Sequence, residues 1–351
     1  MDGLSLKMGV TAWSVAYEDY TTDAGLIGCP QEELPYSHVY IPVLYVISFF
    51  LGFFGNLFVV ALMMGKRGPR RLVDTFVINL AVADLVFVLT LPFWAVSAAL
   101  GNQWLFGAGL CTVSSYSITV TRYSGTLFLM GMSLDRYLAI VRPHRSRALR
   151  TPRCVLTTSG SIWTVSLLLG IPSLVSRRLS KETTHGVCGE ASSVILSSTK
   201  LAMLLLTFLL PLVIILFCYC SILARLRRHC QQGRSRRNSL KIIFTIVGTF
   251  LCSWLPFNTL SSIAIFCSLD WVSLSCGSMQ TLRWGLTLTA CLAFTHSCVN
   301  PIIYIFLDRH FRQQLLRKSL QLFQKPRPVE ATAGSSITFS SHSSALFPRR
   351  G

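Results

Sequence analysis

The sequence predicts an all-α membrane protein: a seven-transmembrane helix bundle followed by a short cytoplasmic amphipathic helix. Hydrophobic residues make up 52% of the 351 residues and charged residues only 13%, which is unusual for a soluble domain. Hydrophobic segments recur at seven places, and most hold the ~20 apolar residues that a spanning helix needs. Lys and Arg gather after every second segment. These three observations together define the predicted fold class.

The seven segments are continuous apolar runs rather than amphipathic helices. Val43 to Phe54 and Leu201 to Cys218 contain no charged residue at all. A soluble helical bundle would need regularly spaced charges in such stretches, so that alternative is excluded. The segments lie roughly at residues 39–64, 74–98, 111–141, 155–176, 196–222, 242–267 and 281–307.

The distribution of positive charge predicts the orientation in the membrane. The net charge is +18, but the basic residues are confined to particular connections, which argues against a nucleic-acid partner. The positive-inside bias predicts an extracellular N-terminus and a cytoplasmic C-terminus at the plasma membrane. The basic groups follow the first, third, fifth and seventh segments, at residues 66–71, 142–153, 225–241 and 309–318.

The chain divides into four regions. Residues 1–37 form an acidic extracellular tail without a signal-peptide pattern, so the first helix is expected to act as the insertion signal. Residues 38–307 form the transmembrane domain. Residues 308–323 alternate apolar and basic side chains, as an amphipathic helix on anionic membrane lipid does. Residues 324–351 form a disordered tail rich in Ser and Thr.

The acidic tail favours a cationic extracellular partner. Within it, Tyr17 and Tyr20 flank Glu18 and Asp19, a context typical of tyrosine sulfation. The alternative is a plain acidic, solvated tail, and the composition does not separate the two.

The sequence gives little support for functions other than signalling. We find no His/Cys metal cluster, nucleophile–base pair or phosphate loop at useful spacing, so neither an enzyme nor a cofactor is expected. A seven-helix transporter or channel is expected to have charged or broken helices along a continuous path across the membrane. Here the ionisable residues separate into three levels, at Arg122, Asp84 and Arg136.

Polar, proline and aromatic residues occur in order along the seven segments. They are Gly55-Asn56, Leu80-Ala81-Val82-Ala83-Asp84, Asp135-Arg136-Tyr137, Trp163, Pro211 with Tyr219, Trp254-Leu255-Pro256 and Asn300-Pro301-Ile302-Ile303-Tyr304. Together they resemble the motifs of the rhodopsin-like (class A) G-protein-coupled receptors. Thr90-Leu91-Pro92, Trp104-Leu105-Phe106-Gly107 and the pair Cys29 and Cys276 are similar to features of the chemokine and chemoattractant-peptide branch.

The resemblance implies a switch. Arg136, neutralised by Asp135, would be released on activation to contact a heterotrimeric G protein and Tyr219. The alternative is a purely structural role, in which the charge of Arg136 is held at the membrane boundary by Asp135. Prolines permit helix bending. The resemblance assigns coupling and switching to Asp135, Arg136, Tyr137, Tyr219, Phe250, Trp254, Pro256, Asn300, Pro301 and Tyr304.

Asp84 should face the interior, because an acid at mid-membrane costs roughly 2.5–3.5 kcal/mol on insertion scales. The resemblance supplies Asn56, Ser297 and Asn300 as its partners, often around an allosteric sodium ion held by Asp84, Ser297 and Asn300. Gly125 stands where the family usually offers a hydroxyl, which removes one oxygen ligand. Sodium binding is therefore open.

The resemblance also implies a ligand cavity lined by Tyr45, Trp94, Ile118, Arg122 and Arg283. Ile118 replaces the aspartate of amine receptors, so monoamines are not expected. Arg122 precedes Arg136 by 14 positions, about 21 Å along a helix. Either it has a structural partner, such as a backbone carbonyl or water, or it binds an anionic ligand group. A free C-terminal carboxylate of an inserted peptide is the sharper hypothesis; a small anionic mediator is the alternative.

Cysteine positions suggest two extracellular disulfides, Cys111 with Cys188 and Cys29 with Cys276. Other pairings are open, and Cys267 could compete for Cys276. On the cytoplasmic side, the Ser- and Thr-rich tail suits receptor kinases and arrestin. The resemblance favours an inhibitory G protein.

Overall fold

The computed structural model of the whole chain describes residues 32, 34–65, 72–143, 151–180, 186–190, 193–228 and 234–307. The predictions for Tyr17, Tyr20, Cys29 and residues 308–351 lie outside this range. Tyr304 belongs to a described helix, but its side chain is outside the description.

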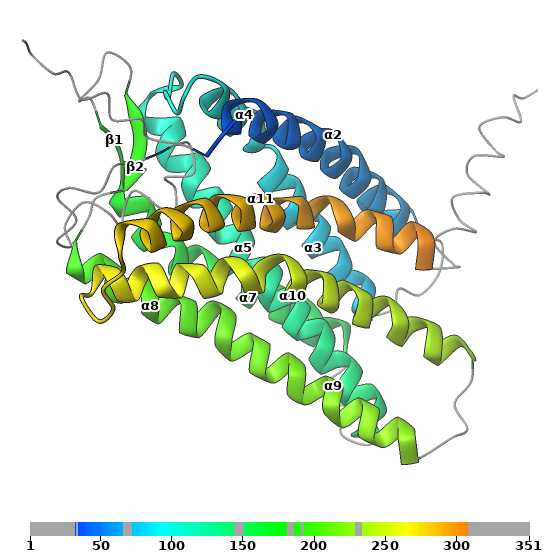
Figure 1. Cartoon of the computed structure of the whole chain (residues 1–351). Helices are drawn as coiled ribbons and strands as arrows, with labels where there is room; N and C mark the ends of the chain where they lie inside the picture. The colour runs from blue at the N-terminus through cyan, green and yellow to red at the C-terminus, as the bar shows by residue number, and fades with distance from the viewer. Residues whose placement is uncertain are drawn as a thin grey trace, which may run out of the picture.

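The described chain forms an elongated bundle of helices with a β-hairpin at one end (Figure 1). The all-α membrane fold predicted from the sequence is thereby confirmed. The elements are α2 (Ser37–Met64), α3 (Leu72–Val88), α4 (Leu91–Ala99), α5 (Gly107–Ile140), α7 (Pro152–Ser176), β1 (Arg177–Ser180), β2 (Val187–Glu190), α8 (Val194–Leu204), a π-helical turn (Leu205–Leu209), α9 (Leu210–Arg228), α10 (Arg234–Ser268) and α11 (Cys276–Leu307).

Two of the seven spans are interrupted, and in each a proline follows the break. Pro92 lies in the first turn of α4, where its missing N–H costs nothing, and the Thr90 hydroxyl donates to the Phe87 carbonyl at 2.7 Å. Pro211 follows the π-helical turn between α8 and α9, where the Thr207 hydroxyl donates to the Met203 carbonyl. A threonine hydroxyl thus donates a hydrogen bond to a backbone carbonyl next to each break.

Six of the spans are long and apolar enough to cross a membrane by composition alone, namely those containing α2, α3 with α4, α7, α8 with α9, α10 and α11. The remaining span, α5, is 34 residues long but too polar to qualify. It packs against α3, α7 and α9, so its hydroxyl groups lie inside the protein. Ser124 and Ser133, for example, are fully buried and donate to carbonyls of their own helix. Our expectation of an apolar third segment therefore needs this correction.

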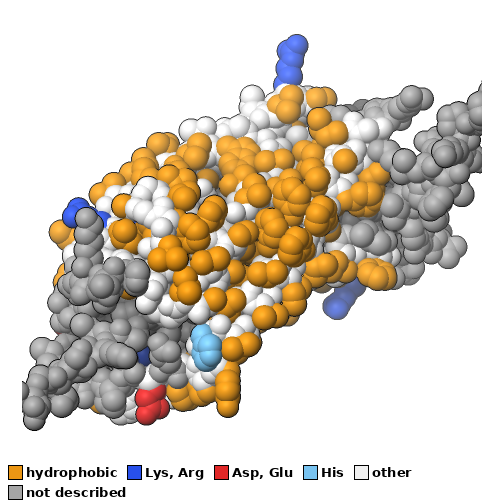
Figure 2. Space-filling view, turned by 90° about the horizontal axis from the view of Figure 1, so that it is seen from above, with side chains coloured by type: hydrophobic (Ala, Val, Ile, Leu, Met, Phe, Trp, Pro, Cys, Tyr) orange, Lys and Arg blue, Asp and Glu red, His pale blue; other side chains and the backbone are white. Residues whose placement is uncertain are grey.

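Hydrophobic side chains cover the middle of the molecular surface. Figure 2 shows one face on which they dominate, while the few charged side chains in view lie near its margins. Large apolar residues such as Phe54, Val175 and Phe217 are 60% or more exposed. A surface of this kind suits contact with lipid rather than water.

The end of the bundle that carries the hairpin, called the hairpin end below, is covalently tied. β1 and β2 pair antiparallel with Leu179 opposite Cys188, and Cys188 forms the predicted disulfide with Cys111 at the start of α5. Cys276 is also disulfide-bonded, to a partner outside the described residues, and Cys267 is a free thiol. The alternative pairing of Cys267 with Cys276 is therefore wrong.

Candidate functional site

A large cavity opens between the helices near the hairpin. It holds about 1070 Å³ of space, its open mouth included, and is walled by α5, α7, α8, α10, α11 and the hairpin. Two of the predicted ligand residues, Ile118 and Arg122, line it together with Trp254. Most of the remaining wall is apolar, with Leu196, Met203, Leu204, Phe257, Ile265 and Phe294 among its residues. Such a concave, mainly apolar space with a few charges is typical of a ligand pocket.

Arg122 is the deep cation of this cavity. Its guanidinium is half-buried, lies 5.1 Å from the ring centre of Tyr123 and 5.9 Å from that of Trp254, and donates a long 3.5 Å hydrogen bond to the Tyr123 hydroxyl. Within the described part of the chain, no carboxylate forms an ion pair with it. Aromatic faces attract a cation but do not neutralise it.

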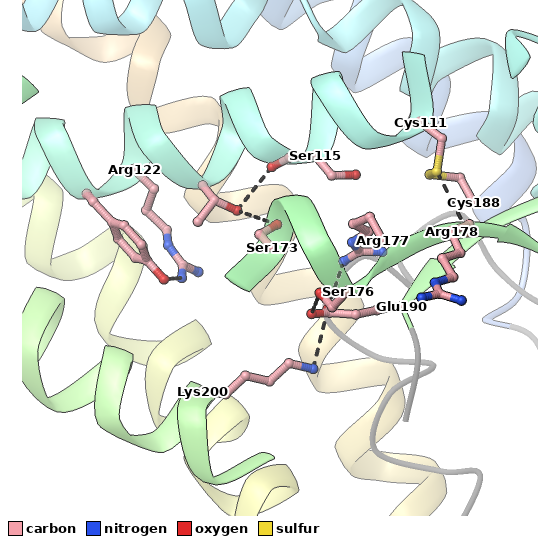
Figure 3. A network of polar contacts seen from close by, with 12 residues as sticks. Cys111, Ser115, Arg122, Ser173, Ser176, Arg177, Arg178, Cys188, Glu190 and Lys200 are labelled. Atoms are coloured by element: carbon pink, nitrogen blue, oxygen red, sulfur yellow. Dashed lines mark hydrogen bonds and ion pairs between the residues drawn. A yellow bond between two sulfur atoms is a disulfide. The ribbon is translucent and has the colours of Figure 1, made fainter. Parts of the chain in front are cut away.

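A second group of charges lies at the hairpin side of the cavity, and the sequence did not predict it. Glu190 of β2 accepts from the Ser176 hydroxyl, and its other oxygen lies 3.3 Å from Arg177 Nη2 and 3.4 Å from Lys200 Nζ (Figure 3). We call Ser176, Arg177, Glu190 and Lys200 the mouth cluster. It joins the end of α7, both strands and α8, so it holds the hairpin against the bundle. The signal available in the sequence was Glu190, two residues after a disulfide cysteine.

The other three predicted ligand residues do not line this cavity. Tyr45 is buried and stacks on Phe294 with ring centres 5.8 Å apart, so it lies behind a cavity residue. Trp94 is buried against Trp104, at 4.8 Å between ring centres. Arg283 is buried in α11. Ligand contact at Tyr45, Trp94 and Arg283 stays a prediction.

A smaller cavity lies around Asp84. Asn300 Nδ2 donates to the Asp84 carboxylate at 2.8 Å, and Ser297 lines the same cavity. The predicted partner Asn56 contacts another residue of this cavity, because its Nδ2 donates to the Ser297 carbonyl at 2.9 Å. The cavity wall also contains Thr121, Arg122, Gly125, Phe250, Trp254 and His296.

An aromatic column connects the two cavities to the middle of α10. The rings of Phe250 and Trp254 lie 6.3 Å apart, and Phe250 contacts the His296 ring edge-on at 5.5 Å. Pro256 is inside α10 and Pro301 inside α11, so each of these helices lacks one backbone hydrogen bond near the column. The arrangement has the components of a hinge.

The Asp135-Arg136-Tyr137 motif lies near the opposite end of α5. Arg136 Nε is 3.9 Å from Asp135 Oδ2, and the two side chains are 16% and 5% exposed. Tyr219 of α9 reaches the same level, where its hydroxyl accepts from Ser133 at 3.3 Å and its ring packs on Phe244. The Tyr137 ring lies 5.8 Å from that of Phe217. A long Arg–Asp contact leaves the arginine able to change partner.

Comparison with known proteins agrees with this architecture. Residues 55–304 match the family described as 7 transmembrane receptor (rhodopsin family). The chain therefore belongs to the rhodopsin-like (class A) G-protein-coupled receptors, and the resemblance noted in the sequence is confirmed. It is a signalling receptor rather than an enzyme, transporter or channel. As a receptor of this family it crosses the plasma membrane several times.

Individual relatives are similar over most of their length. The chain is 48% identical over 306 residues to mouse (Mus musculus) Probable G-protein coupled receptor 25, covering 86% of this chain and 85% of the relative. It is 37% identical over 320 residues to Apelin receptor A of Danio rerio, covering 87% and 88%. Mouse G-protein coupled receptor 15 is 36% identical over 309 residues, covering 86% and 85%.

Proposed function

We propose that this receptor responds to a basic extracellular peptide or chemokine-like protein that inserts an anionic end into the large cavity. The hairpin end faces the outside and the Asp135-Arg136-Tyr137 end faces the cytoplasm. This orientation agrees with the positive-inside distribution of Lys and Arg in the sequence.

The observation that carries the proposal is the charge balance of the cavity wall. Among its described lining residues there are three cations, Arg122, Arg177 and Lys200, but a single carboxylate, Glu190. Glu190 forms ion pairs with Arg177 and Lys200 of the mouth cluster, and it forms none with Arg122. An anion entering the cavity would thus meet an arginine that can bind it through two parallel hydrogen bonds.

A second feature of the wall favours an anion over an amine. Ala290 lines the cavity at the position where chemokine receptors usually carry a glutamate for the ligand's amino end. This wall position offers no carboxylate, so the free C-terminal carboxylate of a peptide fits better than its amino terminus. The acidic residues 1–37 would attract the basic body of the same ligand before its end inserts.

The route from ligand to output follows the contacts already described. A carboxylate on Arg122 would draw the guanidinium from the Trp254 ring, and Trp254 packs next to Phe250 in the column above the α10 hinge. Opening of this hinge would free Arg136 from Asp135 for a heterotrimeric G protein, which we propose to be of the inhibitory type. Receptor kinases and arrestin would then act on residues 324–351, and residues 308–323 would lie on membrane lipid.

A small anionic mediator is the second candidate, because Arg122 would attract it as well. The two candidates differ in whether they need the acidic tail, residues 1–37. A small mediator would act without the tail. A basic protein ligand would lose potency when the acidic residues of the tail, or sulfate groups on Tyr17 and Tyr20, are removed.

The experiment is a screen of basic secreted peptides and chemokines on cells expressing the full chain, with arrestin recruitment as readout. For an agonist so found, Arg122→Ala should reduce potency by roughly 10- to 150-fold, since a hydrogen-bonded charge contact is worth ~1.5–3 kcal/mol. Amidation of the agonist's C-terminus should cost a similar factor in the wild type and little in Arg122→Ala. Arg178→Gln is the matched control, because Arg178 is an exposed hairpin arginine that does not line the cavity. Unchanged potency of Arg122→Ala at normal surface expression would refute the role of Arg122.

A further inference from the structure

The α10 wall of the large cavity carries a hydroxyl group that has no hydrogen-bond partner among the described residues. This is the Ser261 hydroxyl, although the residue lines the cavity and is only 6% exposed. Its neighbours on α10 differ. The Thr259 hydroxyl donates to the Leu255 carbonyl at 2.8 Å, and the Ser262 hydroxyl donates to the Asn258 carbonyl at 2.7 Å. Because an unbonded buried hydroxyl is costly, Ser261 is suited to a polar group that enters the cavity.

Asn258, about one turn deeper on the same helix face, adds an amide to this wall. The residue is 7% exposed and lines the same cavity. Its Nδ2 donates to the Trp254 carbonyl at 2.8 Å, which uses one of the two N–H groups. No described group bonds to its Oδ1, so an acceptor and one N–H donor stay available. Together they match the N–H and C=O groups of a peptide bond.

The other uncharged polar side chains that line the described cavity wall already have hydrogen-bond partners within the protein. They are Thr119, Tyr123, Ser173 and Thr199. The neutral hydrogen-bonding groups left for a ligand are therefore found chiefly on α10.

The spacing of these two residues matches an extended peptide. α10 runs toward the hairpin end (Figure 1), and the Trp254 ring lies 5.9 Å from the Arg122 guanidinium. Asn258 and Ser261 follow Trp254 by four and seven positions, which is about 6 and 10 Å toward the hairpin end. An extended chain advances ~3.3–3.6 Å per residue. A peptide with its terminal carboxylate at Arg122 would thus bring its second and third peptide groups to Asn258 and Ser261.

We propose that Asn258 and Ser261 form a subsite for the backbone of the inserted ligand end. The Asn258 amide pairs with the second peptide group from the carboxyl end, and the Ser261 hydroxyl bonds to the third. The inference rests on the proposed function, because it assumes that a peptide end enters the large cavity. It adds the class of ligand that fits: an extended peptide with at least three peptide groups, in preference to a small anion without them.

The test uses the full-length receptor purified in lipid nanodiscs and three synthetic probes. The first is N-acetyl-trileucine, which has a free carboxylate, three peptide groups and side chains that suit the apolar wall. The second is its C-terminal amide. The third keeps the free carboxylate but has an ester in place of the second peptide bond from the carboxyl end. Apparent dissociation constants come from thermal unfolding at rising probe concentration, because a molecule that binds only the folded state stabilises it.

The ester should bind the wild type more weakly than N-acetyl-trileucine, since it lacks the N–H that faces Asn258 Oδ1. The loss should be roughly 2- to 12-fold, the worth of one hydrogen bond, and little of it should remain in Asn258→Ala. Ser261→Ala should weaken the binding of N-acetyl-trileucine by a similar factor. Without probe, its Tm should not fall, because the hydroxyl has no described protein partner to lose. A purely structural role would lower that Tm instead.

Thr259→Val is the matched control, because Thr259 is exposed on α10 and does not line the cavity; it should bind every probe as the wild type does. The proposal is overturned if N-acetyl-trileucine does not bind the wild type, if the ester binds as tightly, or if Ser261→Ala binds unchanged. The ester comparison needs no variant, so it decides even where a variant does not fold. Equal binding of the acid and its C-terminal amide, with the Ser261→Ala loss intact, supports the subsite and refutes the carboxylate role of Arg122.

Discussion

The mouth cluster offers the sharpest measurement, through the substitution Glu190→Gln. The change keeps the shape of the side chain but removes the negative charge that faces Arg177 Nη2 at 3.3 Å and Lys200 Nζ at 3.4 Å. It also weakens the hydrogen bond that the Ser176 hydroxyl donates to this side chain. Arg177 and Lys200 would then each lose the ion pair with this carboxylate.

The expected loss of stability follows from the burial of the three groups. Arg177 is 2% exposed and Glu190 is 7% exposed, whereas Lys200 keeps 19% of its side-chain surface in contact with solvent. Breaking a buried ion pair costs ~3–5 kcal/mol, and the partial exposure of Lys200 favours the lower value. About 3 kcal/mol corresponds to a fall in Tm of roughly 6–12 °C at 2–4 °C per kcal/mol.

The assay is thermal unfolding of the purified receptor in nanodiscs, arranged as a double-mutant cycle. Glu190→Gln, Arg177→Gln and the double variant are compared with the wild type, and Arg178→Gln serves as the exposed control. Because both residues belong to one network, the coupling free energy should exceed about 1 kcal/mol. A Tm for Glu190→Gln within about 1 °C of the wild type, or additive effects of the two substitutions, would refute the structural role of the cluster.

Two further predictions concern helix packing and signalling. Gly170→Ala places a Cβ 2.8 Å from Val120 and 2.9 Å from Tyr116, so it should force α7 away from α5 and cost ~1–3 kcal/mol, seen as a lower Tm and less receptor at the cell surface. Gly160→Ala, which meets nothing within 4 Å, is its control and should be neutral; equal behaviour of the two variants would contradict the packing. Arg136→Ala should abolish agonist-stimulated nucleotide exchange on the G protein while surface expression stays normal, and undiminished exchange would remove Arg136 from the mechanism.

The fold was predictable because most spans can be recognised from their own composition. A bilayer demands about 20 apolar residues per helix, and six spans satisfy that demand by composition. The third span was predicted at residues 111–141 as one more apolar segment, although α5 is too polar to qualify by composition. Its polar residues are tolerated because neighbouring helices surround it, which is a property of the assembled bundle.

The site was predictable only in part. Arg122, Asp84 and Arg136 stood out because an ionisable residue inside a membrane segment is costly wherever it points. The mouth cluster could not be found in this way, because Glu190 and Lys200 lie in different elements and meet only when the hairpin folds over the bundle. Tyr45 and Trp94, expected in the cavity, are packed against other aromatic rings instead.

The sequence by itself determined that this chain crosses a membrane seven times, with charges at three depths, because hydrophobic length and the cost of buried charge are properties of single segments. The tertiary structure decided which way those charges face. Arg122 lines two cavities, lies beside Trp254 and forms no ion pair with a described carboxylate, because five helices and a hairpin converge there. Contacts between distant segments depend on helix rotation and packing, which no local pattern specifies.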